Sequence, residues 1–372
     1  MIRVNEFEER LDKVQKAMRI KGTDSLIVFS DEWRQGNVRY LSNFRPLTFY
    51  DGSIWSPTLL LIPLEGDPTL FVPDFQILFA QEVSYVKDIK PIASLASELK
   101  RFRSEVARSS RNVGLEGLEI MPFSIYKIVE QYLPDVVLQP STILRELRRI
   151  KSGWEIKMLE RAGEITDQGM LAATNAIKEG VSEREIAVEA EKAIRSAGCD
   201  LSFTTMVGVG PNSSNTERRP GDRKVARGDS VLVDLGAAWQ GYAGDLSRGI
   251  AFGSIPKEHR DIVSIVVEGS RRALSTVRVG VRVSDIDKAS RDVVEQAGYG
   301  KYFVHSAVHG TGLETEEEPF SLNTMIEANM TFVVMCAVYI PHKMGIRLED
   351  SLVATDTGPK LFTHVEREIM VP

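Results

Sequence analysis

The chain has 372 residues, and its 46 Lys and Arg against 52 Asp and Glu give a formal net charge of −6. Apolar residues make up 43% and charged residues 26%, which is typical of a globular protein and excludes a disordered chain, a collagen-like repeat and a coiled coil. The lack of a basic excess disfavours a nucleic-acid binder. A prior of about 150 residues per domain predicts two or three domains.

The sequence carries no signal for secretion or membrane insertion. Its first residues are charged throughout and lack the apolar stretch of a signal peptide. No apolar run reaches the roughly 18 residues of a transmembrane helix. Two cysteines are too few for a disulfide framework. We therefore expect a soluble cytoplasmic protein with neither a membrane nor a nucleic-acid partner.

The first 140 residues alternate helical and strand-like patterns. Apolar residues at a spacing of three and four predict helices, and short apolar runs bounded by Pro or Gly predict strands. This rhythm is typical of an α/β domain. The predicted helices cover residues 6–21 and 92–106, and the predicted strands cover 26–29, 59–62, 70–72 and 112–118.

A long charged helix is predicted over 143–180, and the domain boundary is placed near its start. This placement divides the chain into domains 1–145 and 146–372. The second domain has helical patterns and longer apolar strands, and no short-period repeat is evident. Its predicted helices continue with 182–197, 257–278 and 284–297, and its predicted strands are 204–209, 230–235, 242–252, 332–340 and 345–355.

Four residues of the second domain are candidate metal ligands. Asp234 lies near the end of the apolar run SVLVDLG, and Asp245 follows eleven residues later after two glycines that allow a turn. Two carboxylates brought together by adjacent strands need a cation or a shared proton. His309, in HGTGL, and Glu349, in RLED, are also of ligand type. Taken singly, each fits an ordinary turn or edge-strand residue equally well.

Taken together, these motifs resemble the pita-bread metallopeptidases, which include prolidases, X-Pro aminopeptidases, methionine aminopeptidases and creatinase. The shared pattern is D-x-G, a second Asp after eleven residues, H-G-x-G-L and R-x-E-D. The segments SLIVF and NVRYLSNF are similar to the small prolidase and creatinase domain, and LRRIKSGWEIKMLERA to its linker helix. The resemblance implies a small N-terminal α/β domain of creatinase/prolidase type, a C-terminal pita-bread α+β domain and a homodimer.

The resemblance also implies a metal centre made by two Asp, one His and two Glu. Four of these positions carry over to Asp234, Asp245, His309 and Glu349. The fifth is occupied by Met335, whose neutral thioether is a poor partner for a hard divalent ion. We therefore expect one Mn, Co, Fe or Zn ion rather than two.

Two further positions depart from the family pattern. Glu316 stands where the H-E-x-P motif has its His, and Glu217 stands where the family has a His seventeen residues before the first Asp. The resemblance implies three catalytic candidates, His305, Glu316 and Glu317. It also implies three candidates for substrate binding, Glu217, Asn212 and Arg347, of which Arg347 matches a position that braces the centre.

The expected activity is hydrolysis of an amide-type C–N bond, similar to that of X-Pro dipeptidases and aminopeptidases. The substrate is a dipeptide or another small molecule, and the two added glutamates favour a cationic group on it. Two alternatives remain open. One is a metal-independent, creatinase-like hydrolase of a guanidino or amidino compound, and the other is a non-catalytic binding protein on the same fold.

Overall fold

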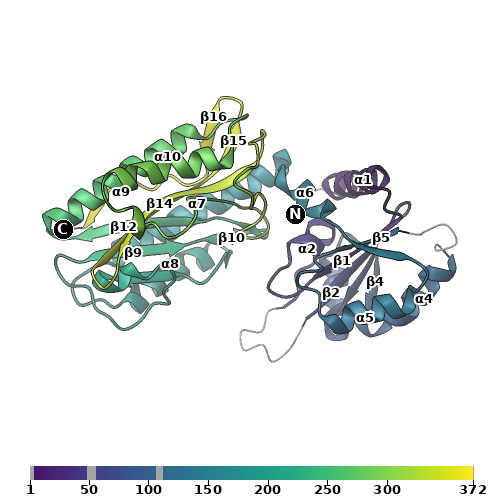
Figure 1. The fold of residues 1–372 in the computed structure, drawn as a ribbon. Helices are drawn as coiled ribbons and strands as arrows, with labels where there is room; N and C mark the ends of the chain where they lie inside the picture. Colours follow the sequence, from purple (N-terminus) through teal and green to yellow (C-terminus); the bar gives the residue numbers. More distant parts are fainter. Residues whose placement is uncertain (1–3, 48–55, 106–111, 372) are drawn as a thin grey trace. The chain divides into compact units, whose positions relative to one another are not determined.

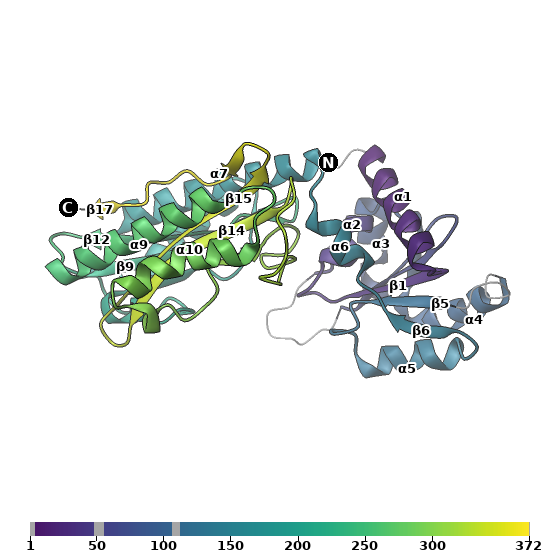
Figure 2. The same ribbon diagram turned by 45° about the horizontal axis from the view of Figure 1, so that its top comes forward.

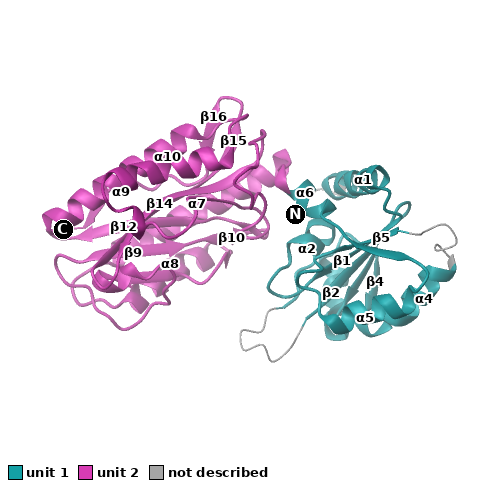
Figure 3. Cartoon of the chain, viewed as in Figure 1, with its two compact units in different colours: residues 1–148 teal, residues 149–372 magenta. Residues whose placement is uncertain are grey.

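The chain divides into two compact units, residues 1–148 and residues 149–372 (Figure 3). The computed structural model describes residues 4–47, 56–105 and 112–371. The predicted boundary between residues 145 and 146 falls inside helix α6 (Ile143–Arg149). Within the described residues, no helix combines the length and the apolar character that crossing a membrane requires.

The first unit is built on a mixed six-stranded sheet with the order β4-β3-β2-β1-β5-β6 (Figures 1 and 2). Strand β1 pairs antiparallel with β2 and parallel with β5. Helices α4 and α5 pack on the sheet face that carries Ile27 and Phe29. The bounds are α1 Val4–Lys21, α2 Gly36–Ser42, α3 Ile77–Val83, α4 Leu95–Glu105, α5 Phe123–Tyr132, β1 Ser25–Ser30, β2 Thr58–Pro63, β3 Thr69–Val72, β4 Asp88–Pro91, β5 Asn112–Glu116 and β6 Val137–Pro140.

The second unit has a larger sheet with the strand order β13-β14-β15-β12-β9-β8, joined by β16 beside β15 and β17 beside β12. A small sheet with the order β11-β10-β7 completes it. The strand bounds are β7 Asp200–Leu201, β8 Met206–Val209, β9 Ser230–Leu235, β10 Ala237–Trp239, β11 Tyr242–Ala243, β12 Leu246–Phe252, β13 Val308–Gly310, β14 Thr331–Ile340, β15 Met344–Thr355, β16 Gly358–Leu361 and β17 Ile369–Val371.

Two helix pairs cover this sheet. Helices α7 (Gly153–Ala176) and α8 (Glu183–Ser196) pack against β8, β9 and β12, whereas α9 (Lys257–Thr276) and α10 (Val283–Gln296) pack against β14 and β15 (Figure 1). The second pair repeats the first at an offset of 100 residues, since α8 and α10 start at 183 and 283. Both pairs turn at a left-handed glycine, Gly180 or Gly280. This repeat was not predicted from the sequence, because short periods alone were considered.

Two predicted elements are interrupted, and the predictions of single elements were wrong there. The helix expected over 143–180 is α6 followed by α7, because Ser152 caps α7 and its hydroxyl accepts a hydrogen bond from the Glu155 amide at 3.1 Å. The strand expected over 242–252 is β11 followed by β12, with Gly244 and Asp245 between them. A side chain on Gly244 would come within 2.3 Å of the Thr166 hydroxyl, so the chain passes α7 closely here.

Candidate metal centre

Strand register aligns the candidate ligands on one face of the large sheet. Ser247 of β12 lies opposite Asp234 of β9 and opposite Glu349 of β15, and Glu349 lies opposite Met335 of β14. Residues directly opposite each other in antiparallel strands point to the same face. Asp245 lies two residues before Ser247 and therefore shares that face. Residues as far apart in sequence as positions 234 and 349 are thus brought into one row.

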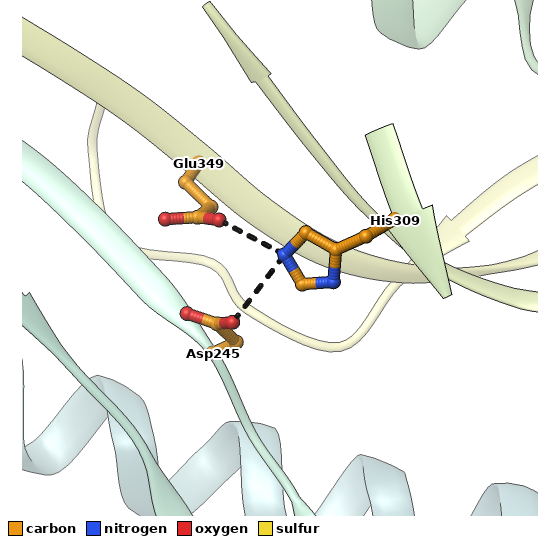
Figure 4. Close-up of side chains that lie close together, drawn as sticks. All are labelled: Asp245, His309 and Glu349. Atoms are coloured by element: carbon orange, nitrogen blue, oxygen red, sulfur yellow. Dashed lines mark ion pairs between the residues drawn. The ribbon is translucent and has the colours of Figure 1, made fainter. Parts of the chain in front are cut away.

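Three of the four predicted ligands converge on one point. The Nε2 atom of His309 lies 3.5 Å from Oε1 of Glu349 and 3.8 Å from Oδ2 of Asp245 (Figure 4). One ligand atom from each of the three residues lies within 4.8 Å of the others. A divalent ion with ligands at about 2.1 Å separates neighbouring ligand atoms by roughly 3.0 to 3.4 Å. A small inward movement would therefore bring the three ligand atoms to coordination distance.

The backbone orients the imidazole of His309 for this role. Its Nδ1 lies 3.1 Å from the Gly310 carbonyl oxygen, which can only accept a hydrogen bond, so Nδ1 carries the proton. With a cation bound, the neutral ring would direct the Nε2 lone pair toward it, whereas without a cation a proton on Nε2 serves the hydrogen bond with Glu349. A hydrogen bond from the second ring nitrogen, here Nδ1, is characteristic of metal-binding histidines.

The electrostatics of the cluster indicate an excess of negative charge. Burial raises the pKa of Asp245 well above its ordinary value, and the charges of Glu349 and Asp234 raise it further. Burial opposes ionisation of Glu349, but its hydrogen bond with His309 and the charge of Arg347 outweigh burial and lower its pKa to about 2. A divalent cation would neutralise this excess, so the three residues fit the metal in charge as well as in geometry.

Comparison with known proteins identifies the family of this chain. Residues 157–356 match the family described as metallopeptidase family M24, and residues 10–150 match the creatinase/prolidase N-terminal domain. The chain belongs to metallopeptidase family M24. Its fold is therefore the predicted one, a creatinase/prolidase-type α/β domain followed by a pita-bread hydrolase domain, and this prediction is confirmed.

Similar proteins align with almost the whole length of this chain. The Xaa-Pro dipeptidase of Pyrococcus furiosus is 31% identical over 98% of this chain and 100% of the relative. The crystal structure of the prolidase from Pyrococcus horikoshii OT3 superposes with a TM-score of 0.86 and 29% identity, covering 97% of this chain and 99% of that one. The X-Pro aminopeptidase from Thermotoga maritima MSB8 also gives 0.86, at 26% identity, with the same two coverages.

Asp234, the fourth predicted ligand, lies outside the cluster of three, but close enough for its charge to interact with those of Glu349 and His309. The carboxylate of Asp234 forms an ion pair with Arg347 through Oδ2, and its Oδ1 is buried without a hydrogen-bond partner in the described structure. The Arg347 Nε also donates to the Ser247 hydroxyl at 2.8 Å, and that hydroxyl donates to Glu349 Oε2 at 2.9 Å. Arg347, predicted as a substrate contact, is thus held within the M24 centre as a brace.

Of the catalytic candidates, His305 and Glu316 lie near the centre. The His305 Nδ1 faces the Ser306 carbonyl at 2.8 Å, and its Nε2 faces the Tyr339 hydroxyl at 3.0 Å. Burial lowers the pKa of His305 and raises that of Tyr339 to about 12, so the neutral imidazole accepts a hydrogen bond from the protonated Tyr339 hydroxyl. Glu316 is exposed, and its charge contributes to raising the pKa values of Asp245 and His309.

Of the remaining candidates, Glu317 and Asn212 have partners outside the ligand cluster. Glu317 is buried, and its Oε1 accepts a hydrogen bond from the buried Lys151 ammonium at 2.7 Å. This ion pair ties the loop after β13 to the start of α7. Asn212 donates its amide to Glu183 at 2.7 Å. Glu217 is exposed.

Sequence reasoning missed several residues that shape the M24 centre. Ser351 donates its hydroxyl to the Asp245 carbonyl at 2.6 Å and accepts the Asp245 amide at 3.2 Å, which fixes the backbone of this ligand. Ser247 bridges Arg347 and Glu349 as described above. The available signal was weak: a serine within a strand that is otherwise buried almost throughout.

Proposed function

We propose that the chain is a metal-dependent hydrolase of amide-type C–N bonds, similar to an X-Pro dipeptidase, that uses one divalent ion. The convergence of Asp245, His309 and Glu349 carries this proposal. The Xaa-Pro dipeptidase relative that covers the full chain supports the reaction class. A divalent ion at this position supplies Lewis-acid polarisation of the scissile carbonyl and lowers the pKa of water.

The protein's own residues prepare the site for that ion. Asp245, His309 and Glu349 bind it, and the Ser351 hydroxyl holds the Asp245 backbone in place. Arg347 balances the buried charge of Asp234 and, through Ser247, restrains Glu349. The supporting contacts therefore reduce the reorganisation needed when substrate arrives.

The position of Met335 supports a single ion. Met335 lies directly across from Glu349 and is 6% exposed, so its side chain stands beside the ligand cluster on the same sheet face. A thioether brings neither charge nor a hard oxygen to a second divalent ion. The Oδ2 atom of Asp234, a residue that the resemblance assigns to the metal centre, is engaged by Arg347.

Substitution of Met335 by Glu tests the number of ions. We expect about one Mn(II) per wild-type chain by elemental analysis after gel filtration, and about two per M335E chain, because the added carboxylate lies directly across from Glu349. M335Q is the matched control and should keep one ion, since it has a similar size without the charge. Two ions in the wild-type protein would contradict the single-ion site.

Glu316 supports selection of a cationic substrate. Its charge acts on two of the three ligand residues, Asp245 and His309, so its carboxylate lies close to where substrate must bind. Its side chain is exposed and therefore accessible to a bound molecule. We propose that it recognises an ammonium or guanidinium group of the substrate.

A pair of dipeptides that differ in one charge tests this selectivity. We expect kcat/KM for Lys-Pro to exceed that for norleucine-Pro by ~10-fold, which corresponds to about 1.4 kcal/mol, and E316Q to remove most of the difference. E327Q carries the same charge change on a residue that is paired with Arg149 and should retain the preference. Turnover without metal would favour the creatinase-like alternative, and neither metal nor turnover would favour the binding protein.

A further inference from the structure

The chain segment 210–223 forms a rim beside the metal centre. It begins with a short 3-10 helix, Gly210–Ser214, and carries two predicted substrate contacts, Asn212 and Glu217. The Thr216 carbonyl accepts a hydrogen bond from Arg347 Nη1 at 3.4 Å, which brings the segment next to the site. The Ser213 hydroxyl accepts the Gly345 amide at 2.7 Å, which attaches the first turn to β15.

One buried carboxylate holds both ends of this segment. Glu183 is the first residue of α8 and is 0% exposed. Its Oε1 accepts the Val209 amide at 2.9 Å and the Asn212 side-chain amide at 2.7 Å. Its Oε2 accepts the Gly221 amide at 2.9 Å and lies 3.6 Å from the Arg218 guanidinium.

The two carboxylate oxygens of Glu183 bind opposite ends of the segment. Oε1 binds residues before Glu217, and Oε2 binds residues after it, so the Glu183 carboxylate closes residues 212–221 into a loop. The backbone reinforces the closure, because the Glu183 amide donates to the Arg223 carbonyl at 3.0 Å and the Arg184 amide donates to the Gly221 carbonyl at 3.1 Å. A fixed loop presents its side chains without the entropy loss of ordering them on binding.

We propose that Glu183 is a positioning residue for substrate recognition: its carboxylate holds the 210–223 segment, and with it Glu217, in the orientation that contacts the substrate. The proposal rests on the hydrolase function proposed above. Glu183 differs from a residue that merely stabilises α8, because its carboxylate contacts the 209–221 region rather than its own helix.

Substitution of Glu183 by Gln tests this role. The variant keeps the shape of the side chain, but its NH2 group must face an N–H donor at one end of the segment, which breaks the closure there. We expect KM for Lys-Pro to rise by about tenfold with kcat changed less than about twofold, because binding geometry is lost and the metal ligands are untouched. We also expect faster hydrogen exchange at the amides of Val209 or Gly221.

The matched control is Glu185→Gln on the same helix. Glu185 belongs to the capping box of α8 with Ser182, and Gln preserves that motif, so exchange at Val209 and Gly221 and the KM should stay as in the wild type. If E183Q fails to fold, E183D retains the charge but is one methylene too short to reach both ends, and it should show the same KM effect.

Two results would overturn the proposal. One is unchanged hydrogen exchange over 209–221 in E183Q, and the other is faster exchange with an unchanged KM. Failure of the proposed function can be distinguished from failure of the role of Glu183. It would appear in the wild-type protein itself, as absent turnover or absent preference for Lys-Pro. The wild-type protein could turn over both dipeptides without preferring Lys-Pro. In that case, faster exchange in E183Q together with a higher KM for norleucine-Pro would still support positioning by Glu183.

Discussion

Asp245→Asn is expected to abolish stoichiometric binding of a divalent ion. The substitution replaces one of the three converging ligands by a neutral amide of the same shape, and metal ions prefer the carboxylate oxygen. In the wild-type protein, an ion at 100 times its Kd should stabilise the fold by ~2.7 kcal/mol through mass action. We expect Mn(II) to raise the wild-type Tm accordingly and to leave the D245N Tm unchanged, as measured by differential scanning fluorimetry.

The metal-free D245N protein provides an independent test, in which the sign of the change in stability is measured. Burial and the neighbouring carboxylates raise the pKa of Asp245 in the folded state, so its ionised form disfavours folding near neutral pH. The neutral Asn removes this penalty, and the metal-free variant should unfold at the same temperature as the metal-free wild type or at a higher one. The control D222N changes a carboxylate that is 89% exposed and should retain the Mn(II) response. Undiminished Mn(II) binding by D245N would contradict the ligand set.

Asp350→Ala is expected to cause the largest loss of stability. Asp350 and Arg248 form an ion pair at 2.6 Å in which both side chains are 0% exposed. Asp350 also accepts hydrogen bonds from Thr363 at 3.1 Å and from Arg367 at 2.8 Å, which fasten the C-terminal segment to β15. Removing one member of a buried pair leaves an uncompensated charge and costs about 3 to 5 kcal/mol in the free energy of unfolding.

Urea unfolding monitored by circular dichroism measures this loss. The transition of the second unit should move to lower urea concentration with little change in slope, since the surface exposed on unfolding stays nearly the same. The control D261A removes an exposed pair with Lys257, whose side chains are 53% and 80% exposed, and should cost less than about 0.5 kcal/mol. A loss below ~1 kcal/mol in D350A would show that the five carbonyl contacts of Arg248 satisfy its charge without Asp350.

Short-range patterns in the sequence predicted several elements well, although the helix expected over 143–180 and the strand expected over 242–252 are each divided in two. Strand β9 and helix α8 appear where apolar spacing predicts them, because each buries a continuous apolar face. The short helices α2, α3 and α5 were not predicted. Each covers ten residues or fewer, and tertiary packing rather than helical periodicity stabilises such segments.

The candidate site also has features that the sequence predicted and features that it did not. The motifs identified Asp245, His309 and Glu349, and these residues meet in the structure. They also grouped Asp234 with the ligands, whereas the structure pairs its carboxylate with Arg347. Both Asp234 and Arg347 lie in matching motifs, but their spacing in sequence carries no information about which charge reaches which partner.

By itself, the sequence determined the family, the two-domain α/β architecture and the chemical types of the candidate metal ligands, because these depend on motif order and apolar periodicity along the chain. Only the tertiary structure decided which groups meet. Glu183 reaches Gly221, and Lys151 reaches Glu317 across 166 positions of sequence. Such contacts depend on strand register and helix packing, where a shift of a single residue turns a side chain to the opposite face of the sheet.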